Sequence, residues 1–253
     1  MPLPPPYAQK PYMLFVYCRN DEVNTEEVTL IHSMLTRTGI MVDFDFAHAS
    51  EVCQDTLIPH RNSGVIIGGS DFSAYDPILW MPRLTGFIRA CYEDNVALLG
   101  ICFGHQVVAA TLANGLVKRA PNGREFGNAS IDLTLNGMND PLFLDVPNTF
   151  VGLETHADVV AEVSCNGEVQ ILAGSAHTSV QSLAIGKKIR TVQFHPECSS
   201  RHIVERAHRR RKSLFEEGFF HDDKDFDAFI SGLEETPNAR KVFRNFLQQF
   251  VMR

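Results

Sequence analysis

The stretch Leu98-Leu-Gly-Ile-Cys-Phe-Gly-His-Gln106 places a cysteine between two glycines where an apolar strand passes into a helix. The spacing Gly100-x-Cys102-x-Gly104 is the cysteine form of the nucleophile elbow, a turn so sharp that residues two before and two after the nucleophile must lack side chains. Such a cysteine projects above the sheet at the start of the next helix, where the helix dipole favours a thiolate. The pattern predicts a nucleophile at Cys102. The alternative is a small buried residue packed between the two elements.

A second segment, residues 190–198, supplies a base and a carboxylate. It reads Arg-Thr-Val-Gln-Phe-His-Pro-Glu-Cys, and Pro196 favours an extended backbone at His195. In an extended segment residues two apart share a face, so Glu197 can hold one imidazole nitrogen while the other faces Cys102. This is the Cys–His–acid arrangement of nucleophilic catalysis. The alternative is a surface turn that contains His-Pro-Glu by accident.

The rest of the chain alternates short apolar runs with helical patterns, which predicts an α/β fold. Strands are expected at 12–18, 40–46, 64–67 and 96–99, with helices at 23–38, 77–95 and 103–114. Further strands are expected at 129–135, 149–154, 169–176, 180–185 and 189–194. This order predicts a mainly parallel central sheet flanked by helices, whose ligands bind beyond the carboxyl ends of the strands.

The predicted domain organisation is a flexible arm followed by one domain. Residues 1–11 are rich in proline, which blocks regular structure. Residues 12–253 are expected to form a single domain, with a C-terminal extension of two or three helices at 201–253. Its expected packing anchors are phenylalanines, at positions 219, 220, 226, 229, 243, 246 and 250.

Composition excludes several classes of protein. The chain has 253 residues, 44% of them hydrophobic, and a formal net charge of −7, which argues against non-specific nucleic-acid binding. No two of the six cysteines form a C-x-x-C pair, so we expect reduced thiols in a cytoplasmic protein. No apolar run suits a signal peptide or approaches the roughly 20 residues that cross a bilayer. The basic run 209–212 is interpreted as a solvated helix face.

Three segments together resemble the class I glutamine amidotransferases: the elbow, the His-Pro-Glu segment and the Gly-Gly-Ser loop at 68–70. Their order and separation fit that family as well. The resemblance implies a flavodoxin-like fold and a catalytic triad of Cys102, His195 and Glu197. In this family the cysteine attacks the side-chain amide of glutamine, a γ-glutamyl thioester forms, ammonia leaves, and water completes the cycle.

The resemblance also implies the contacts around the substrate. It assigns the oxyanion hole to the N–H groups of Gly69 and Phe103. It assigns substrate binding to Gln106, Thr155, His156, Ala157 and Asp158, although the last four also suit a plain strand-to-turn stretch. No metal or cofactor is expected. Ser70 stands where family members often have proline, so the loop is expected to be shaped for a different substrate or to be more mobile.

Three functions remain open. The long tail after Glu197 and the elbow sequence resemble the stand-alone γ-glutamyl peptidase branch, which hydrolyses γ-glutamyl bonds without a synthase. Residues 124–127, Arg-Glu-Phe-Gly, resemble the GMP-synthetase branch, whose glutaminase supplies ammonia to a synthase partner. The chain has no nucleotide-binding signature of its own. The third possibility is a degenerate, non-enzymatic amidotransferase fold.

Overall fold

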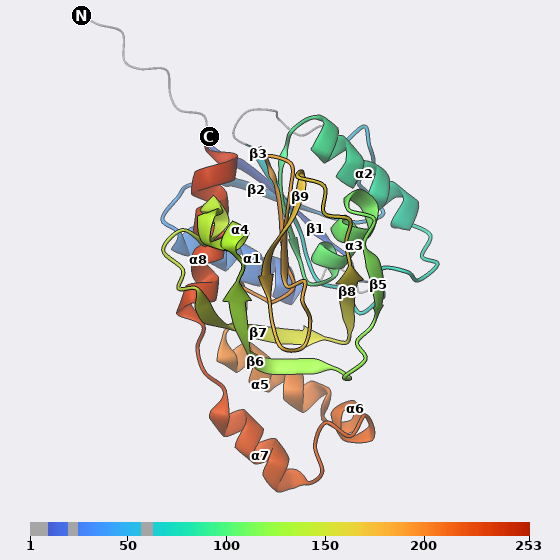
Figure 1. The fold of residues 1–253 in the computed structure, drawn as a ribbon, viewed down its shortest axis with the longest axis vertical. Coiled ribbons are helices and arrows are strands. Elements are labelled where there is room, and N and C mark those ends of the chain that lie inside the picture. Colours follow the sequence, from blue (N-terminus) through green and yellow to red (C-terminus); the bar gives the residue numbers. More distant parts are fainter. Residues whose placement is uncertain (1–9, 20–24, 57–62) are drawn as a thin grey trace, which may run out of the picture.

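A mixed nine-stranded sheet lies at the centre of the molecule (Figure 1). The computed structural model describes residues 10–19, 25–56 and 63–253, and within these ranges the strand order is β2-β1-β3-β4-β11-β10-β9-β6-β7. The strands are β1 (Tyr12–Tyr17), β2 (Asp43–His48), β3 (Ser63–Ile67), β4 (Ala97–Ile101), β6 (Glu125–Leu133), β7 (Thr149–His156), β9 (Val169–Gly174), β10 (Ser182–Ile185) and β11 (Ile189–Val192). A separate two-stranded sheet pairs β5 (Leu116–Arg119) with β8 (Asp158–Glu162).

The sheet is parallel from β2 to β11 and antiparallel from β11 to β7. In the parallel part Ile67 pairs with Gly100, and Ile101 pairs with Val192. The carboxyl ends of β3, β4 and β11 therefore meet at one edge. This confirms the predicted fold class, and it brings the glycine loop, the elbow and the His-Pro-Glu segment together.

Alternate residues of β1 face two hydrophobic cores on opposite sides of the sheet, as the period of a strand requires. Met13 and Phe15 pack on the side of α1 (Thr25–Arg37) and α8 (Pro237–Phe246). Leu14 and Val16 pack on the side of α2 (Met81–Glu93) and α3 (Phe103–Leu112). Figure 1 shows the two helix layers on either side of the sheet.

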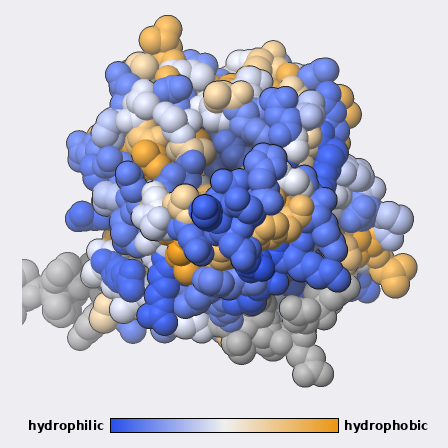
Figure 2. Space-filling view, turned by 90° about the horizontal axis from the view of Figure 1, so that it is seen from below, coloured by the Kyte–Doolittle hydropathy of each residue, from blue (hydrophilic) through white to orange (hydrophobic). Residues whose placement is uncertain are grey.

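The C-terminal helices form two separate packing units. A third core, rich in phenylalanine, joins α5 (Ser200–Arg209), α6 (Arg211–Glu216) and α7 (Asp223–Gly232) to the outer face of β6 and β7. The chain then returns to the main core through α8 and the π-helical segment Leu247–Val251. Five of the seven predicted phenylalanine anchors are buried in these cores, and the other two, Phe219 and Phe229, are partly buried and pack against the third core. Figure 2 shows that the end carrying α5–α7 is mostly hydrophilic, with hydrophobic residues in small separate patches.

Several short elements differ from the sequence-based expectation. The strands β5 and β8, helix α4 (Leu135–Asn139) and the 3-10 turn Pro141–Phe143 were not expected. They are too short for a clear period, and β5 and β8 pair only with each other among the described residues. The tail holds four α-helices rather than two or three.

Two further expectations concern the chain as a whole. Most of the arm predicted at 1–11 lies outside the described residues, and the division into arm and single domain stays a prediction. Among the described residues, no helix has both the length and the apolar character that crossing a membrane requires.

Candidate active site

The backbone is strained at Cys102, between the end of β4 and the start of α3. Its φ of 54° and ψ of −106° lie in a region that non-glycine residues rarely adopt. A Cβ atom at Gly100 would lie 2.6 Å from the Gly104 carbonyl oxygen, and one at Gly104 would lie 2.2 Å from the Ile67 carbonyl oxygen. Both glycines are therefore required for the turn, as the elbow motif predicts.

His195 lies directly beside this turn. Its backbone N–H donates to the Leu153 carbonyl at 2.8 Å, and its Nδ1 lies 2.5 Å from Oε1 of Glu197. Both side chains are buried. Burial alone would lower the pKa of His195, but the charges of Glu197 and Cys102 and its hydrogen bonds to both side chains raise it to about 10. The neighbouring Glu197 carboxylate therefore favours the protonated form of the imidazole.

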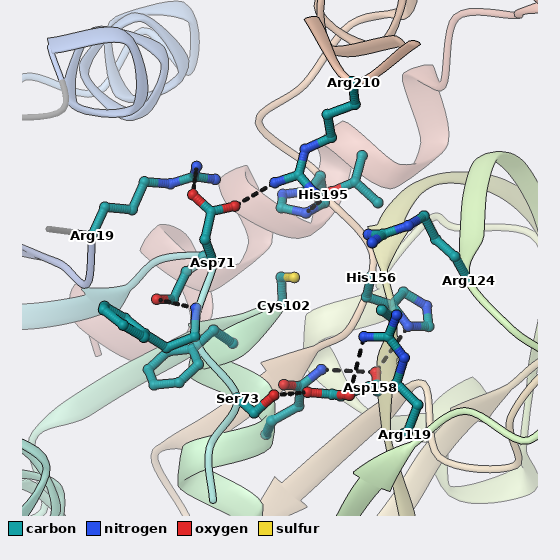
Figure 3. Close-up of a pocket in the computed structure, with 17 residues that line it drawn as sticks. Arg19, Asp71, Ser73, Cys102, Arg119, Arg124, His156, Asp158, His195 and Arg210 are labelled. Carbon is teal, nitrogen blue, oxygen red and sulfur yellow. Dashed lines mark hydrogen bonds and ion pairs between the residues drawn. The ribbon is translucent and has the colours of Figure 1, made fainter. Parts of the chain in front are cut away.

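Nine of the ten predicted site residues line a single cavity (Figure 3). The exception is Glu197, which lies behind His195. Thr155 Oγ1 lies 3.0 Å from His195 Nε2, so this threonine contacts the imidazole directly. The backbone N–H of Phe103 is the first of α3 and has no acceptor within the helix, which leaves it available at the cavity.

Asp158 forms the polar floor of the cavity opposite His195. Its carboxylate accepts hydrogen bonds from Ser73 Oγ and, at 3.2 Å, from Tyr75 Oη, and Arg119 Nη1 lies 3.9 Å away. The side-chain amide of Gln106 donates to the Asp158 carbonyl at 2.9 Å. Gln106 therefore fixes the backbone at Asp158 from α3, in addition to lining the cavity.

His156 is linked to two carboxylates behind the cavity. Its Nε2 lies 3.0 Å from Glu125 Oε2 and 3.2 Å from Glu154 Oε2, while Nδ1 lies 2.9 Å from the Asp158 carbonyl oxygen. Burial alone would lower its pKa, but the charge of Glu154 and hydrogen bonds to Glu125 and Glu154 raise the pKa of His156 to about 10. A buried cation therefore supports the backbone on which Asp158 stands.

Gly69 is not free to serve as an oxyanion donor in this structure. Its N–H donates to Glu27 Oε1 at 2.8 Å, and Glu27 is a buried residue of α1. Burial raises the pKa of Glu27, while the charge of Arg19 opposes that shift. The oxyanion role of Gly69 stays a prediction, and it requires this bond to open.

Sequence reasoning missed most of the charged residues at the cavity. Four arginines and Asp71 line it together with the predicted residues, and the arginines are Arg19, Arg119, Arg124 and Arg210. They come from a loop, from strand ends and from a helix junction, and only Arg119 and Arg124 lie near each other in the sequence, so no local spacing identifies the set. One signal was present in the basic run 209–212, for which the sequence predicts a solvated face. Arg210 departs from that prediction because it reaches the cavity.

Two groups of side chains bring three possible metal ligands together. They are His195, Glu197 and Cys198, and Glu125, Glu154 and His156, each with its ligand atoms within 4.8 Å of one another. In the first group His195 already pairs with Glu197, and in the second His156 already pairs with Glu125 and Glu154. The expectation that no metal or cofactor is needed stays a prediction.

The family of the chain follows from comparison with known proteins. Residues 29–209 match the family described as "Glutamine amidotransferase class-I". The chain belongs to the class-I glutamine amidotransferases. This membership and the relatives described next make it an enzyme of hydrolase type.

Two curated relatives represent different branches. "Gamma-glutamyl peptidase 4" of Arabidopsis thaliana is 27% identical over 201 residues, which cover 75% of this chain and 76% of the peptidase. "GMP synthase [glutamine-hydrolyzing]" of Lactiplantibacillus plantarum is 31% identical over 162 residues, which cover 60% of this chain but only 29% of the synthase. Among solved structures, a glutamine amidotransferase from Thermotoga maritima has a TM-score of 0.74 at 19% identity and covers 96% of this chain and 99% of its own; it shows the shared fold.

Proposed function

We propose that this amidotransferase-family chain is a γ-glutamyl hydrolase that works through a thioester on Cys102. The observation that carries the proposal is the arrangement at the elbow: a cysteine at a strained strand–helix turn lines the same cavity as His195, whose Nδ1 lies 2.5 Å from the Glu197 carboxylate. A thiol beside a histidine whose other nitrogen is oriented by a carboxylate is the arrangement of a cysteine nucleophile and its acid–base partner.

The reaction proceeds in two halves. Cys102 Sγ bonds to the γ-carbonyl carbon, the oxyanion collapses, the C–N bond breaks, and the amine nitrogen takes the proton of the His195 imidazolium. Water then gives a proton to the neutral His195 and bonds to the same carbon. The C–S bond breaks, which restores the thiolate and releases glutamate. The Phe103 N–H stabilises the oxyanion in both halves, joined by the Gly69 N–H once it leaves Glu27.

The glutamyl group is oriented by the charges opposite His195. Its α-ammonium suits the Asp158 carboxylate, and its α-carboxylate suits Arg119, Arg124 and the backbone groups at 157–158. This orientation puts the γ-carbonyl over Cys102, in the centre of the cavity. Fixed charges of both signs are what a zwitterionic end requires.

A free-standing hydrolase is favoured over a synthase subunit. Support comes from the peptidase relative, whose match spans three quarters of both chains, whereas the synthase relative matches over less than a third of its length. A glutaminase that feeds a separate synthase remains the second candidate, because the similarity to the synthase is slightly higher where it exists.

The experiment is a substrate panel with the chain alone: glutamine, glutathione and γ-glutamyl dipeptides. We expect hydrolysis without a partner, and mass spectrometry of acid-quenched enzyme to detect one glutamyl group on Cys102. Cys102→Ser is the matched control. Activity that appears only after a synthase is added would favour the second candidate, and full activity in Cys102→Ser would refute the mechanism.

A further inference from the structure

One cluster at the cavity is not used by the reaction described above. It consists of Arg19, Asp71 and Arg210, and it is called here the arginine clamp. Asp71 Oδ2 lies 2.8 Å from Arg19 Nη1, and Asp71 Oδ1 pairs with Arg210 Nη2. All three side chains line the cavity that holds Cys102. A single carboxylate therefore sits between two guanidinium groups at the cavity wall.

The clamp lies on the side where the leaving group must depart. Figure 3 shows Arg19, Asp71 and Arg210 on the His195 side of Cys102, with Asp158, Ser73 and Arg119 on the opposite side. A Cβ atom built on Gly69 would lie 3.5 Å from His195 Cε1 and 4.0 Å from Arg19 Nη2. The Arg19 guanidinium and the His195 imidazole thus both border Gly69.

The two arginines keep donors for a further anion. A guanidinium has five N–H donors in a planar fork, and Asp71 takes only some of them. Arg19 Nε is buried and faces Glu27 Oε2 at 3.8 Å, so the donors that Arg19 can offer to a ligand are those of its terminal nitrogens. The Arg210 side chain is 37% exposed, which leaves it open to the cavity. Such forks match a carboxylate with two parallel hydrogen bonds.

We propose that the arginine clamp binds a carboxylate on the leaving group, so that the preferred substrates are γ-glutamyl amino acids or short γ-glutamyl peptides with a free C-terminus. The inference rests on the proposed γ-glutamyl hydrolase function. In a γ-glutamyl amino acid this carboxylate is one carbon away from the departing nitrogen, and each added residue moves it outward by about 3.3–3.6 Å. Ammonia, the leaving group of glutamine, has no carboxylate and gains nothing from the clamp.

The origin of Arg210 connects this specificity to the C-terminal helices. Its neighbours in the basic run bind elsewhere: Arg209 pairs with Glu26 at 3.1 Å, Arg211 pairs with Asp223, and Lys212 lies 3.8 Å from Glu216. Arg210 follows α5 directly, at the junction with α6. The packing of α5 and α6 against the sheet therefore positions one arm of the clamp.

The test compares γ-glutamyl-alanine with its C-terminal amide, which differ only in the negative charge of the leaving group. We expect wild-type kcat/KM to favour the acid by about tenfold or more, as expected for one charge-assisted bidentate contact. Arg210→Ala and Arg19→Gln should reduce that ratio to about twofold. Arg209→Ala, in the same run but away from the cavity, should leave the ratio unchanged. The kcat/KM of glutathione, compared with that of γ-glutamyl-alanine, shows whether the clamp also binds the carboxylate of a longer leaving group.

A purely structural role for the clamp gives a different result. If the clamp only joins the 70–76 loop to α5, the arginine substitutions should lower activity on the acid and on the amide equally. A wild-type ratio of kcat/KM values near one would overturn the inference and leave the proposed function intact. Absence of hydrolysis for every γ-glutamyl compound, glutamine included, would refute both. If the arginine variants fail to fold, calorimetric binding of the acid and the amide to Cys102→Ser decides, and equal affinities would overturn the inference.

Discussion

The amide nitrogen of Gly69 lies 2.8 Å from Oε1 of Glu27, a buried carboxylate supplied by α1. The loop after β3 is therefore held from outside the cavity by a helix whose own residues do not line it. Arg19 and Arg206 face the same carboxylate, and their charges oppose the rise in its pKa that burial causes. Glu27 thus offsets the charges of the partly buried Arg19 and the buried Arg206 while it fixes the glycine loop.

Removing that carboxylate should destabilise the protein. Glu27→Ala leaves the buried Gly69 N–H without its acceptor and removes the negative charge that Arg19 and Arg206 face, so we expect the free energy of unfolding to fall by about 2–4 kcal/mol. Glu27→Gln keeps an acceptor oxygen for Gly69 and should cost less. Urea unfolding of the three proteins measures the difference, and equal losses for both variants would mean that the Gly69 hydrogen bond is unimportant.

The space at the elbow should make Gly104 irreplaceable. A methyl group there would meet the Ile67 backbone oxygen at 2.2 Å, so Gly104→Ala should cost about 3 kcal/mol or more, or prevent folding. Gly86, within α2, has nothing within 4 Å of the position that a methyl group would take, and Gly86→Ala should stabilise by about 0.5–1 kcal/mol. Melting temperatures check both. A well-folded Gly104→Ala protein would show that the elbow can relax.

Loss of Glu197 should be less severe than loss of the nucleophile. Cys102→Ala removes the atom that forms the thioester and should abolish turnover. Glu197→Gln removes the charge that favours the imidazolium but retains the nucleophile and oxyanion donors, so measurable activity should remain. Values of kcat/KM on one γ-glutamyl dipeptide compare the two. Equal losses, with both proteins folded, would point to a structural role for Glu197.

Alkylation should distinguish Cys102 from the other buried cysteines. Burial raises the pKa of Cys18, Cys91 and Cys198, so these thiols should react slowly with iodoacetamide. Cys165 is exposed and competes for the reagent, so the experiment uses Cys165→Ser. We expect one rapid label, on Cys102, that parallels loss of activity. Rapid labelling of Cys18 or Cys198 instead would contradict an activated Cys102.

The buried imidazolium at His156 should make stability depend on pH. Its pKa is raised from 6.5 to about 10 in the folded protein, so its contribution is complete below about pH 6.5 and is lost as pH rises towards 10. The free energy of unfolding should therefore fall with pH in this range, by at most about 1.4 kcal/mol per pH unit for one titrating group, and His156→Gln should remove that dependence. Urea unfolding at several pH values in this window measures it. Parallel curves for the two proteins would show that His156 is neutral when folded.

The turn at Cys102 was predictable because the residues that it requires are close together in the sequence. Gly100, Cys102 and Gly104 stand at fixed spacing, and the steric contacts of both glycines explain why no other residue fits. The pair His195 and Glu197 was predictable for the same reason, since one extended segment carries both. The parallel part of the sheet then places the two segments side by side.

The charged lining of the cavity was not predictable, because its residues share no local pattern. Arg19, Asp71 and Arg210 come from three segments that meet only in the fold. The partner of Gly69 was missed because a glutamate on an amphipathic helix ordinarily faces water, and only the packing of α1 buries Glu27. Pairs of residues this far apart in the sequence become visible only in the folded structure.

The positive φ of Cys102 lowers the stability of the folded protein at the residue that the proposed reaction requires. An L-residue held in this conformation costs about 1–3 kcal/mol, a cost that glycine largely escapes. A mutational search for heat resistance alone would therefore tend to replace Cys102, the proposed nucleophile, with glycine and select a more stable protein without activity. Screens for thermostable variants of this chain therefore need a test of activity, since relief of the strain at Cys102 removes its sulfur.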